Sequence, residues 1–458
     1  MLNWSPELGA SGLPRYLEIA DAIERDIRSG LLAPGRRLPP QRRLAERLGL
    51  DFTTVSRGYS EAQSRGLVES HVGRGTFVRA DAAPPLVPEA DPRRAREQDL
   101  AMNMAPEPND PELLAAMREG FAAIAANLVP LLRYQSATGS EQDRAAGLSW
   151  LSQRGMVPNL DRIAITPGAH AAMTAIFSLL ATPGDIILCE SVTYPGLRSI
   201  ASKHGLALVG LPEDEDGILP DALDAAILAR RPKALYLNPT LRNPTTRTIP
   251  PERRGEIATV LLRHGLPLIE DDAYGFIPPN PPAPIATLAP ALAWHIGGLA
   301  KCIGAGLRLA YTIAPDSRST YLPGQAIRTM TVMPSPLTMA VATRWIEDGT
   351  ADRIRRFIRA ETAARQRIAA EALKGHSFAS DPNAFNIWLR LPEGAGRAEL
   401  MGRMAGRDIG LMPSDAFTVL GEPGESLRVC LGGAIGRDRL REGLMFMANT
   451  LSGQSWHG

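Results

Sequence analysis

The segment Ile296–Tyr311 reads IGGLAKCIGAGLRLAY and places one lysine among small and apolar residues, directly after a strand-like run. The chain has 50 basic residues but only four lysines, and the other three have polar neighbours. Lys301 lies between Leu299 and Ile303 instead. A lysine removed from water has a lowered pKa and can form a Schiff base. Taken alone, the segment equally fits an ion-paired lysine at the start of a helix.

Length and composition describe a cytoplasmic, globular protein of two or three domains. The chain has 458 residues, is 44% hydrophobic and has a formal net charge of +1, which excludes a disordered chain. It has no uncharged apolar run of about 18 residues, so we expect no membrane-spanning helix. Its first ten residues lack a basic segment followed by an apolar core, so we expect no signal peptide. Its three scattered cysteines are expected to be reduced core residues. No Cys/His cluster has metal-ligand spacing, and we predict no metal site.

The N-terminal residues 14–65 predict three helices. Apolar residues recur at helical spacing from Tyr16 to Ile27, Gly49 ends a short second helix over about 41–48, and a third begins near Thr53. Residues 67–78 then alternate like two strands around a glycine-rich turn. This order predicts a helix-turn-helix followed by a β-hairpin wing, and a plain helical bundle with a hairpin is the alternative.

Charge supports a nucleic-acid partner for this end of the chain. Residues 14–80 hold twelve arginines, no lysine and eight acidic residues. The sequence from Arg15 to Val78 resembles the winged helix-turn-helix domain of GntR-family transcription regulators. The resemblance implies binding to a double-stranded DNA operator. It gives as candidate contacts Arg42, Thr53, Thr54, Ser56 and Arg57 and, in the wing, His71, Gly73 and Arg74. Gln41 and Phe52 depart from the family pattern.

Composition changes twice after this domain. We place the DNA-binding domain at 1–80, a proline-rich linker at 81–100, and a second domain at 101–458. From there, helical segments alternate with seven strand-like runs, which predicts an α/β domain with a mostly parallel, buried sheet. We expect its large part at about 135–335 and a smaller α+β subdomain at about 336–458.

Five motifs in the α/β region fall at predicted strand ends, where active sites of such sheets gather. They are a small-residue turn, an aromatic residue before Pro-Gly, an Asn-Pro loop, an acidic strand end and the lysine segment: TPGAHA at 166–171, ESVTYPG at 190–196, NPTLRNPT at 238–245, IEDDAY at 269–274, and Lys301 with Arg308. Together these motifs indicate a pyridoxal 5′-phosphate site. They supply a helix start that can bind phosphate, an aromatic ring that can stack on the cofactor, a carboxylate and a lysine that can form a Schiff base.

With these motifs, residues 101–458 resemble a fold-type I aminotransferase, and the whole chain resembles the MocR/PdxR subfamily of GntR regulators. The resemblance implies that Lys301 forms the internal aldimine, Asp271 pairs with the pyridine nitrogen, and Asn243 and Tyr274 bond the ring hydroxylate. The family pattern selects Asp271 because it lies three residues before the tyrosine. The remaining implied roles are stacking by Tyr194, phosphate binding by Arg308, Gly168, Ala169 and His170, a contact of Tyr134 with the partner subunit's phosphate in a homodimer, and a ligand-carboxylate clamp at Arg428.

Plainer roles stay open for several of these residues. Tyr194 could be a core residue, His170 a helix cap and Arg428 part of a structural ion pair, while Glu270 and Asp272 could be solvated or capping groups. The family's serines near the lysine are replaced by Gly298 and Ala300, and Ala305 stands where proline is common.

The favoured function is a transcription regulator that senses pyridoxal phosphate, an amino compound as an external aldimine, or both. A catalytically active aminotransferase with a DNA-binding domain is the alternative, since every residue for transamination is present. A regulator whose cofactor site has decayed is the third hypothesis, suggested by Gly298 and Ala300.

Overall fold

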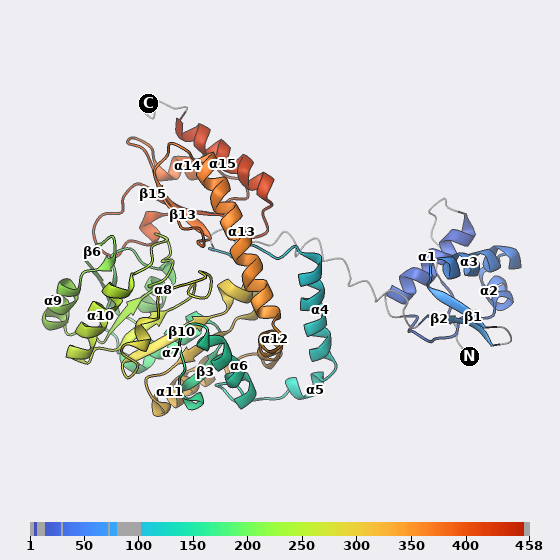
Figure 1. Ribbon diagram of the computed structural model, residues 1–458, viewed down its shortest axis with the longest axis horizontal. Coiled ribbons are helices and arrows are strands. Elements are labelled where there is room, and N and C mark those ends of the chain that lie inside the picture. The colour runs from blue at the N-terminus through green and yellow to red at the C-terminus, as the bar shows by residue number, and fades with distance from the viewer. Residues whose placement is uncertain (1–3, 7–13, 29–30, 72–73, 80–101, 453–458) are drawn as a thin grey trace. The chain divides into compact units, whose positions relative to one another are not determined.

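The computed structural model describes residues 4–6, 14–28, 31–71, 74–79 and 102–452. The chain divides into two compact units, residues 1–98 and 99–458, and each is described by itself (Figure 1). The linker predicted at 81–100 and the wing residue Gly73 lie outside the described residues.

The first unit has the winged helix-turn-helix fold that the sequence predicts. Its three helices are followed by an antiparallel hairpin in which Val68 pairs with Val78 and His71 with Gly75. The bounds are α1 (Arg15–Arg28), α2 (Gln41–Leu48), α3 (Phe52–Ser64), β1 (Val68–His71) and β2 (Gly75–Val78).

Local chemistry explains the turn between α2 and α3. Gly49 ends α2 with φ 63°, a left-handed conformation that glycine adopts without steric cost. Asp51 then caps α3 by accepting from the Thr54 N–H at 2.9 Å. Behind the turn, Ile19 of α1 packs so closely against Gly58 of α3 that a Cβ there would lie 2.8 Å from its Cγ2.

The second unit is built on a seven-stranded sheet in the order β3-β11-β10-β9-β8-β4-β5. All strands are parallel except β11, which is antiparallel to both neighbours. The seven strand-like runs of the sequence are all strands of this sheet. They are β3 (Ile163–Thr166), β4 (Ile186–Glu190), β5 (Ala207–Leu211), β8 (Ala234–Leu237), β9 (Leu268–Asp271), β10 (Ala293–Gly298) and β11 (Ala310–Ile313).

Helices cover both faces of this sheet because its strands are apolar on both sides. In β8, Leu235 and Leu237 join one core while Ala234 and Tyr236 join the other. The second core is closed by α7 and α8, and the first by helices that include α6, α10, α12 and α13. The helix bounds are α4 (Pro111–Ala125), α5 (Leu128–Leu131), α6 (Glu141–Ser152), α7 (Ala169–Leu180), α8 (Pro195–Lys203), α9 (Pro220–Arg230), α10 (Pro251–His264), α11 (Ser317–Thr331), α12 (Pro336–Glu347) and α13 (Thr350–Ala372).

A smaller antiparallel sheet forms the C-terminal subdomain, in the order β12-β13-β15-β14. The helix α13 joins both parts, since Ile354 lies in the core of the large part and Ile368 in the core of the small one (Figure 1). The remaining bounds are β6 (Glu213–Asp214), β7 (Gly217–Ile218), β12 (Phe378–Ala379), β13 (Asn386–Arg390), α14 (Arg397–Arg403), β14 (Leu411–Pro413), β15 (Ser426–Cys430) and α15 (Arg437–Ser452).

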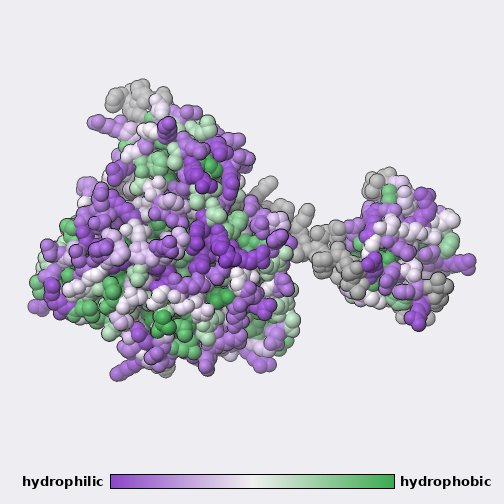
Figure 2. Space-filling view, viewed as in Figure 1, coloured by the Kyte–Doolittle hydropathy of each residue, from purple (hydrophilic) through white to green (hydrophobic). Residues whose placement is uncertain are grey.

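Hydrophilic residues cover most of the visible face of the second unit, with small hydrophobic areas between them (Figure 2). Among the described residues, no helix is long and apolar enough to cross a membrane. Within the same ranges, no group of three or more His, Cys, Asp or Glu side chains is placed to hold a metal ion.

Candidate functional site

A cavity of about 320 Å³ opens at the carboxyl edge of the large sheet, where β3, β4, β8, β9 and β10 end. The structure brings together there ten of the eleven residues that the sequence proposed for cofactor and ligand binding. They are Gly168, Ala169, His170, Tyr194, Asn243, Asp271, Tyr274, Lys301, Arg308 and Arg428. Tyr134 is the exception: it does not line the cavity, and its side chain is 86% exposed.

Lys301 lies on a single turn, Ala300–Gly304, that directly follows β10. Its Nζ donates to the main-chain oxygen of Asn103 rather than to a carboxylate. Burial, and then the nearby positive charge of Arg428, lowers the pKa of Lys301 to about 8. A substantial fraction of this amine is therefore neutral near pH 8 and able to attack a carbonyl carbon.

Asp271 ends β9 and is 4% exposed. Its Oδ2 accepts from the hydroxyl of Tyr236 at 2.9 Å, whereas Oδ1 has no hydrogen-bond partner within the described ranges. Burial raises the pKa of Asp271 to about 6. An unpartnered, buried carboxylate oxygen beside a cavity fits a ligand with a protonated nitrogen, because such a ligand would satisfy it.

The two acidic neighbours of Asp271 have other partners, so they are not solvated groups. Asp272 pairs with Arg154 at 2.9 Å and contacts His295 at 3.3 Å. Burial opposes ionisation, but these two partners outweigh it and hold the pKa of Asp272 below its usual range. Glu270 accepts from the Ile285 and Ala286 N–H groups at 3.0 and 2.7 Å, so it caps the short turn Ile285–Thr287.

The Asn-Pro loop after β8 is fixed by Asn238. Its Nδ2 donates to the main-chain oxygen of Asp271 at 2.6 Å, and its Oδ1 accepts from the Asn243 N–H at 3.1 Å. The Asn243 side chain accepts from Nη1 of Arg428 at 3.2 Å. Tyr274 is 4% exposed, and burial raises the pKa of its hydroxyl well above the usual range.

The phosphate-binding end predicted from the sequence is the start of α7. Gly168 has φ 84°, and a Cβ there would lie 3.1 Å from Nη2 of Arg308, so glycine permits both the turn and the approach of the arginine. Arg308 itself has φ 51°, an uncommon left-handed conformation for a residue with a side chain. N–H groups at a helix start together with a guanidinium form an anion-binding arrangement.

Gly298, which replaces a serine of the family pattern, leaves open space in this end of the cavity. A Cβ at this position would meet only the Cβ of Ala169, at 4.0 Å.

Tyr194 is held in place by His170, whose Nε2 lies 2.6 Å from its hydroxyl. Gly196 permits this arrangement, because a Cβ there would lie 2.3 Å from Cε1 of Tyr194 and 2.6 Å from Nε2 of His170. Desolvation of its ring, and then the charges of Arg308 and Lys301, lowers the pKa of His170, although the residue as a whole is exposed. The side-chain hydrogen bond of His170 is the one to Tyr194.

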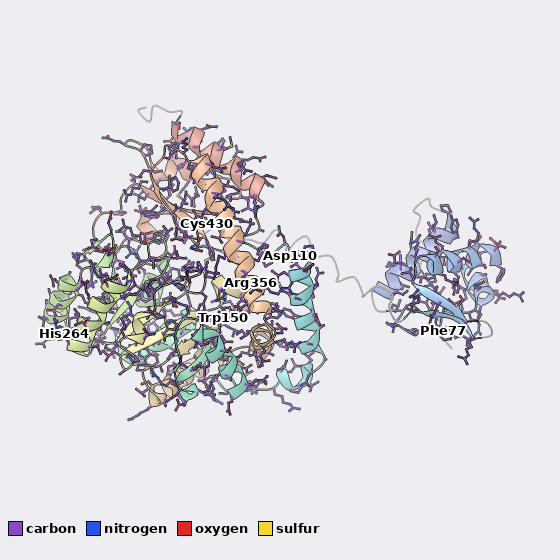
Figure 3. The ribbon with its side chains drawn as sticks, viewed as in Figure 1. Phe77, Asp110, Trp150, His264, Arg356 and Cys430 are labelled. Carbon is purple, nitrogen blue, oxygen red and sulfur yellow. The ribbon has the colours of Figure 1, made fainter. Side chains whose placement is uncertain are left out.

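Arg428 extends from β15 into the cavity and is 2% exposed. Its guanidinium lies 5.3 Å from the ring centre of Phe417. Figure 3 marks Cys430, two residues further along the same strand, within the small subdomain. The ligand site is thus formed by both parts of the second unit.

Several residues that line or support the cavity were not identified from the sequence. Tyr236 bonds Asp271, Asn103 bonds Lys301, and Met412 lines the wall. A polar tyrosine inside the apolar strand β8 was a usable signal for Tyr236. Asn103 had no local signal, because it lies directly after the proline-rich segment and far from the rest of the site in sequence.

The first unit presents most of the predicted DNA-contact side chains at its surface. Arg42 is exposed and lies 5.7 Å from the ring centre of Phe52, while Arg57 lies 4.2 Å from that of Tyr16. A guanidinium within about 6 Å of a ring centre is attracted to the face of the ring. Arg74 is exposed in the hairpin turn.

The other predicted DNA contacts, three hydroxyl residues and the wing histidine, differ in their exposure and in their contacts within the unit. Thr53 and Thr54 both turn their hydroxyls back to the carboxylate of Asp51. Ser56 is half-buried. His71 is exposed, 3.3 Å from Glu69 and edge-on to Phe77, which Figure 3 labels in the wing.

The comparisons with known proteins agree with this geometry. Residues 99–444 match the family model Aminotransferase class I and II, and the chain belongs to this family. Residues 15–78 match the model Bacterial regulatory proteins, gntR family. Together the two matches make the chain a transcription regulator of the GntR/MocR type with an aminotransferase-like domain, and the helix-turn-helix implies a DNA partner.

Two relatives whose names describe regulators match most of this chain. The HTH-type transcriptional regulator YdeF of Bacillus subtilis is 28% identical over 98% of this chain and 97% of its own length. The probable rhizopine catabolism regulatory protein MocR of Rhizobium meliloti is 24% identical over 85% of this chain and 82% of its own. Among solved structures, the α-aminoadipate aminotransferase LysN of Thermus thermophilus has a TM-score of 0.69 at 22% identity, over 77% of this chain and 92% of its own, which supports the fold.

Proposed function

We propose that this protein binds pyridoxal 5′-phosphate at Lys301 and that occupancy of the site by the cofactor and an amino compound controls its binding to operator DNA. The observation that carries the proposal is the buried cavity in which Lys301, of lowered pKa, and the unpartnered Oδ1 of Asp271 lie together. When bound, pyridoxal phosphate supplies a carbonyl carbon that condenses with primary amines and a ring that withdraws electrons.

The residues of the cavity fit each part of this cofactor. Lys301 would bond its carbonyl carbon, and Asp271 would accept from the protonated ring nitrogen through the oxygen that has no protein partner. Arg308 and the first N–H groups of α7 would hold the phosphate. The lining residues Tyr194, Asn243 and Tyr274 would stack on the ring and bond its oxygen.

Arg428 supports a carboxylate on the amino compound. It is a buried guanidinium at the cavity wall, and a planar guanidinium binds carboxylates in bidentate fashion. Its Nη1 donates to the side chain of Asn243 at 3.2 Å, which places the guanidinium beside the Asn-Pro loop. An amino acid would therefore replace Lys301 on the cofactor through its amino group and bind Arg428 through its carboxylate at the same time.

Exposed apolar side chains around Tyr134 support a homodimer. Val129 is 68% exposed, Leu132 66% and Tyr134 86%. Large apolar or aromatic side chains exposed close together in the sequence are typical of protein interfaces. In a dimer, Tyr134 would reach the partner subunit's phosphate site, and light scattering of the full chain tests this assembly.

The test is a spectrophotometric titration of the full chain with pyridoxal phosphate, using Lys301→Ala and, as the matched control, Lys203→Ala. Lys203 is an exposed lysine at the end of α8. We expect the lysine-linked absorbance band in the wild type and in the control, and its loss in Lys301→Ala. Equal spectra for all three proteins would mean that the cofactor is not held by Lys301.

Catalytic transamination is the second candidate, favoured by the pKa of about 8 for Lys301, which suits proton transfer near neutral pH. An active transaminase would release a keto acid from an amino acid and convert the cofactor to its amine form. A sensor would instead hold the amino compound without releasing product. Product analysis after a single turnover separates these two outcomes.

A further inference from the structure

Three hydrogen bonds connect the Asn-Pro loop to the hydroxyl of Tyr274. The main-chain oxygen of Pro244 accepts from Nδ2 of Asn386 at 2.7 Å, and Oδ1 of Asn386 accepts from Nδ2 of Asn103 at 3.0 Å. The same Nδ2 of Asn103 donates to the Tyr274 hydroxyl oxygen at 3.1 Å. Asn386, Asn103 and Tyr274 are 2%, 3% and 4% exposed, so water does not substitute for any of these bonds.

The first acceptor sets the direction of the whole chain of bonds. A peptide oxygen can only accept, so Asn386 must turn its NH₂ group to Pro244 and its oxygen to Asn103. Asn103 must then present its own NH₂ group, whose two hydrogens go to Asn386 and Tyr274. The oxygen of Tyr274 is therefore an acceptor in this bond, and its own hydrogen is directed elsewhere.

Tyr274 lines the cavity together with Asn103, Lys301 and Asn243. Its hydroxyl accepts from Asn103, and among the described residues its own hydrogen has no acceptor. A buried O–H without an acceptor is costly, so it is suited to a ligand oxygen.

The main chain at Asn103 and Asn386 is itself held in place. Nζ of Lys301 donates to the main-chain oxygen of Asn103, and two residues further on the Gly433 N–H donates to the main-chain oxygen of Ala105 at 3.1 Å. Nε2 of Gln366 donates to the main-chain oxygen of Asn386 at 3.0 Å. The chain of hydrogen bonds is thus anchored on three separate segments of the second unit.

We propose that Asn386 and Asn103 are positioning residues that aim the hydroxyl hydrogen of Tyr274 at the ring oxygen of the bound cofactor. The inference rests on the proposed function, since the ring oxygen belongs to pyridoxal phosphate. A hydrogen bond to the charged form of a group favours that form. The aimed hydroxyl therefore stabilises the ionised ring oxygen and lowers the pH at which the proton shared by this oxygen and the Lys301 nitrogen is lost.

The test is a pH titration of the absorbance of the cofactor-loaded full chain. In Asn103→Asp, an ionised carboxylate can only accept, so Tyr274 would turn its hydrogen away from the cavity. We expect the midpoint to rise by about one to two pH units, the scale of one hydrogen bond to a charged group. Asn103→Ala, which leaves the hydroxyl free to rotate, should give a smaller rise, and the exposed Asn109→Asp should give none.

A double-mutant cycle with Tyr274→Phe separates positioning from a simple charge effect. We expect Asn103→Asp to cause no further rise in the Tyr274→Phe background. An equal rise in both backgrounds, or midpoints of Asn103→Asp and Asn103→Ala equal to that of the wild type, would overturn the proposal. Failure of the wild type itself to give a lysine-linked band would instead refute the proposed function, and this inference with it.

Discussion

Asp271 is predicted to cost the cofactor-free protein stability, and Asp271→Asn should relieve that cost while weakening cofactor binding. Burial raises the pKa of Asp271 from 3.8 to about 6. The difference of roughly two pKa units corresponds to about 3 kcal/mol of unfolding free energy. Asparagine keeps an oxygen to accept from Tyr236 but cannot ionise.

The sign of the pH dependence follows from the raised pKa. The folded state binds this proton more tightly than the unfolded state, so ionisation of Asp271 lowers stability as the pH rises from about 4 to above 6. We therefore expect Asp271→Asn to melt at a higher temperature than the wild type at pH 7.5, with the difference shrinking toward pH 4. Differential scanning calorimetry of the cofactor-free proteins measures both quantities.

The neighbouring Asp272 supplies a matched control of opposite sign. Its partners Arg154 and His295 hold its pKa below the usual range, so its ionised form stabilises the fold. Asp272→Asn would leave Arg154 buried without a full partner, at a cost of about 3–5 kcal/mol. The reasoning is refuted if Asp271→Asn melts no higher than the wild type at pH 7.5, or if it binds pyridoxal phosphate equally well.

Three further substitutions test other parts of the account. Gly298→Ser has room beside Ala169 and should tighten pyridoxal phosphate binding about 10- to 100-fold by adding one hydrogen bond to the phosphate, measured by absorbance titration. Gly196→Ala should weaken the same binding about tenfold or more, because its methyl group would displace Tyr194, and should cost about 1–3 kcal/mol of stability. Arg74→Ala should weaken DNA binding for all sequences alike and reduce the salt dependence of the affinity by about one unit of slope, measured by fluorescence anisotropy.

The sheet and the strand-end residues were predictable because their signals are local. A parallel strand buried on both faces is a continuous apolar run, and the polar residue that follows it marks the carboxyl edge. Asp271 and Lys301 both follow such runs, in β9 and β10. The helix-turn-helix was equally predictable, because Gly49 and Asp51 are residue types that cap helices and they lie on either side of its turn.

The supporting residues were not predictable because their contacts span the chain. Asn103 and Tyr274 are 171 positions apart, and Asn103 and Asn386 are 283 apart. The direction of their hydrogen bonds depends on a carbonyl in yet another loop, which no spacing rule encodes. Tyr134 is a different case: its predicted role needs a second subunit, so it stays a prediction.

The most direct test of the central claim is the affinity of the full chain for its own operator, with and without pyridoxal phosphate. Operator fragments would be selected by the full chain from genomic DNA and then titrated with the wild type, Lys301→Ala and Lys203→Ala. The account predicts that the cofactor changes the affinity of the wild type and of Lys203→Ala but not that of Lys301→Ala. An affinity that is the same with and without cofactor in all three proteins, alone or with amino acids added, would contradict it.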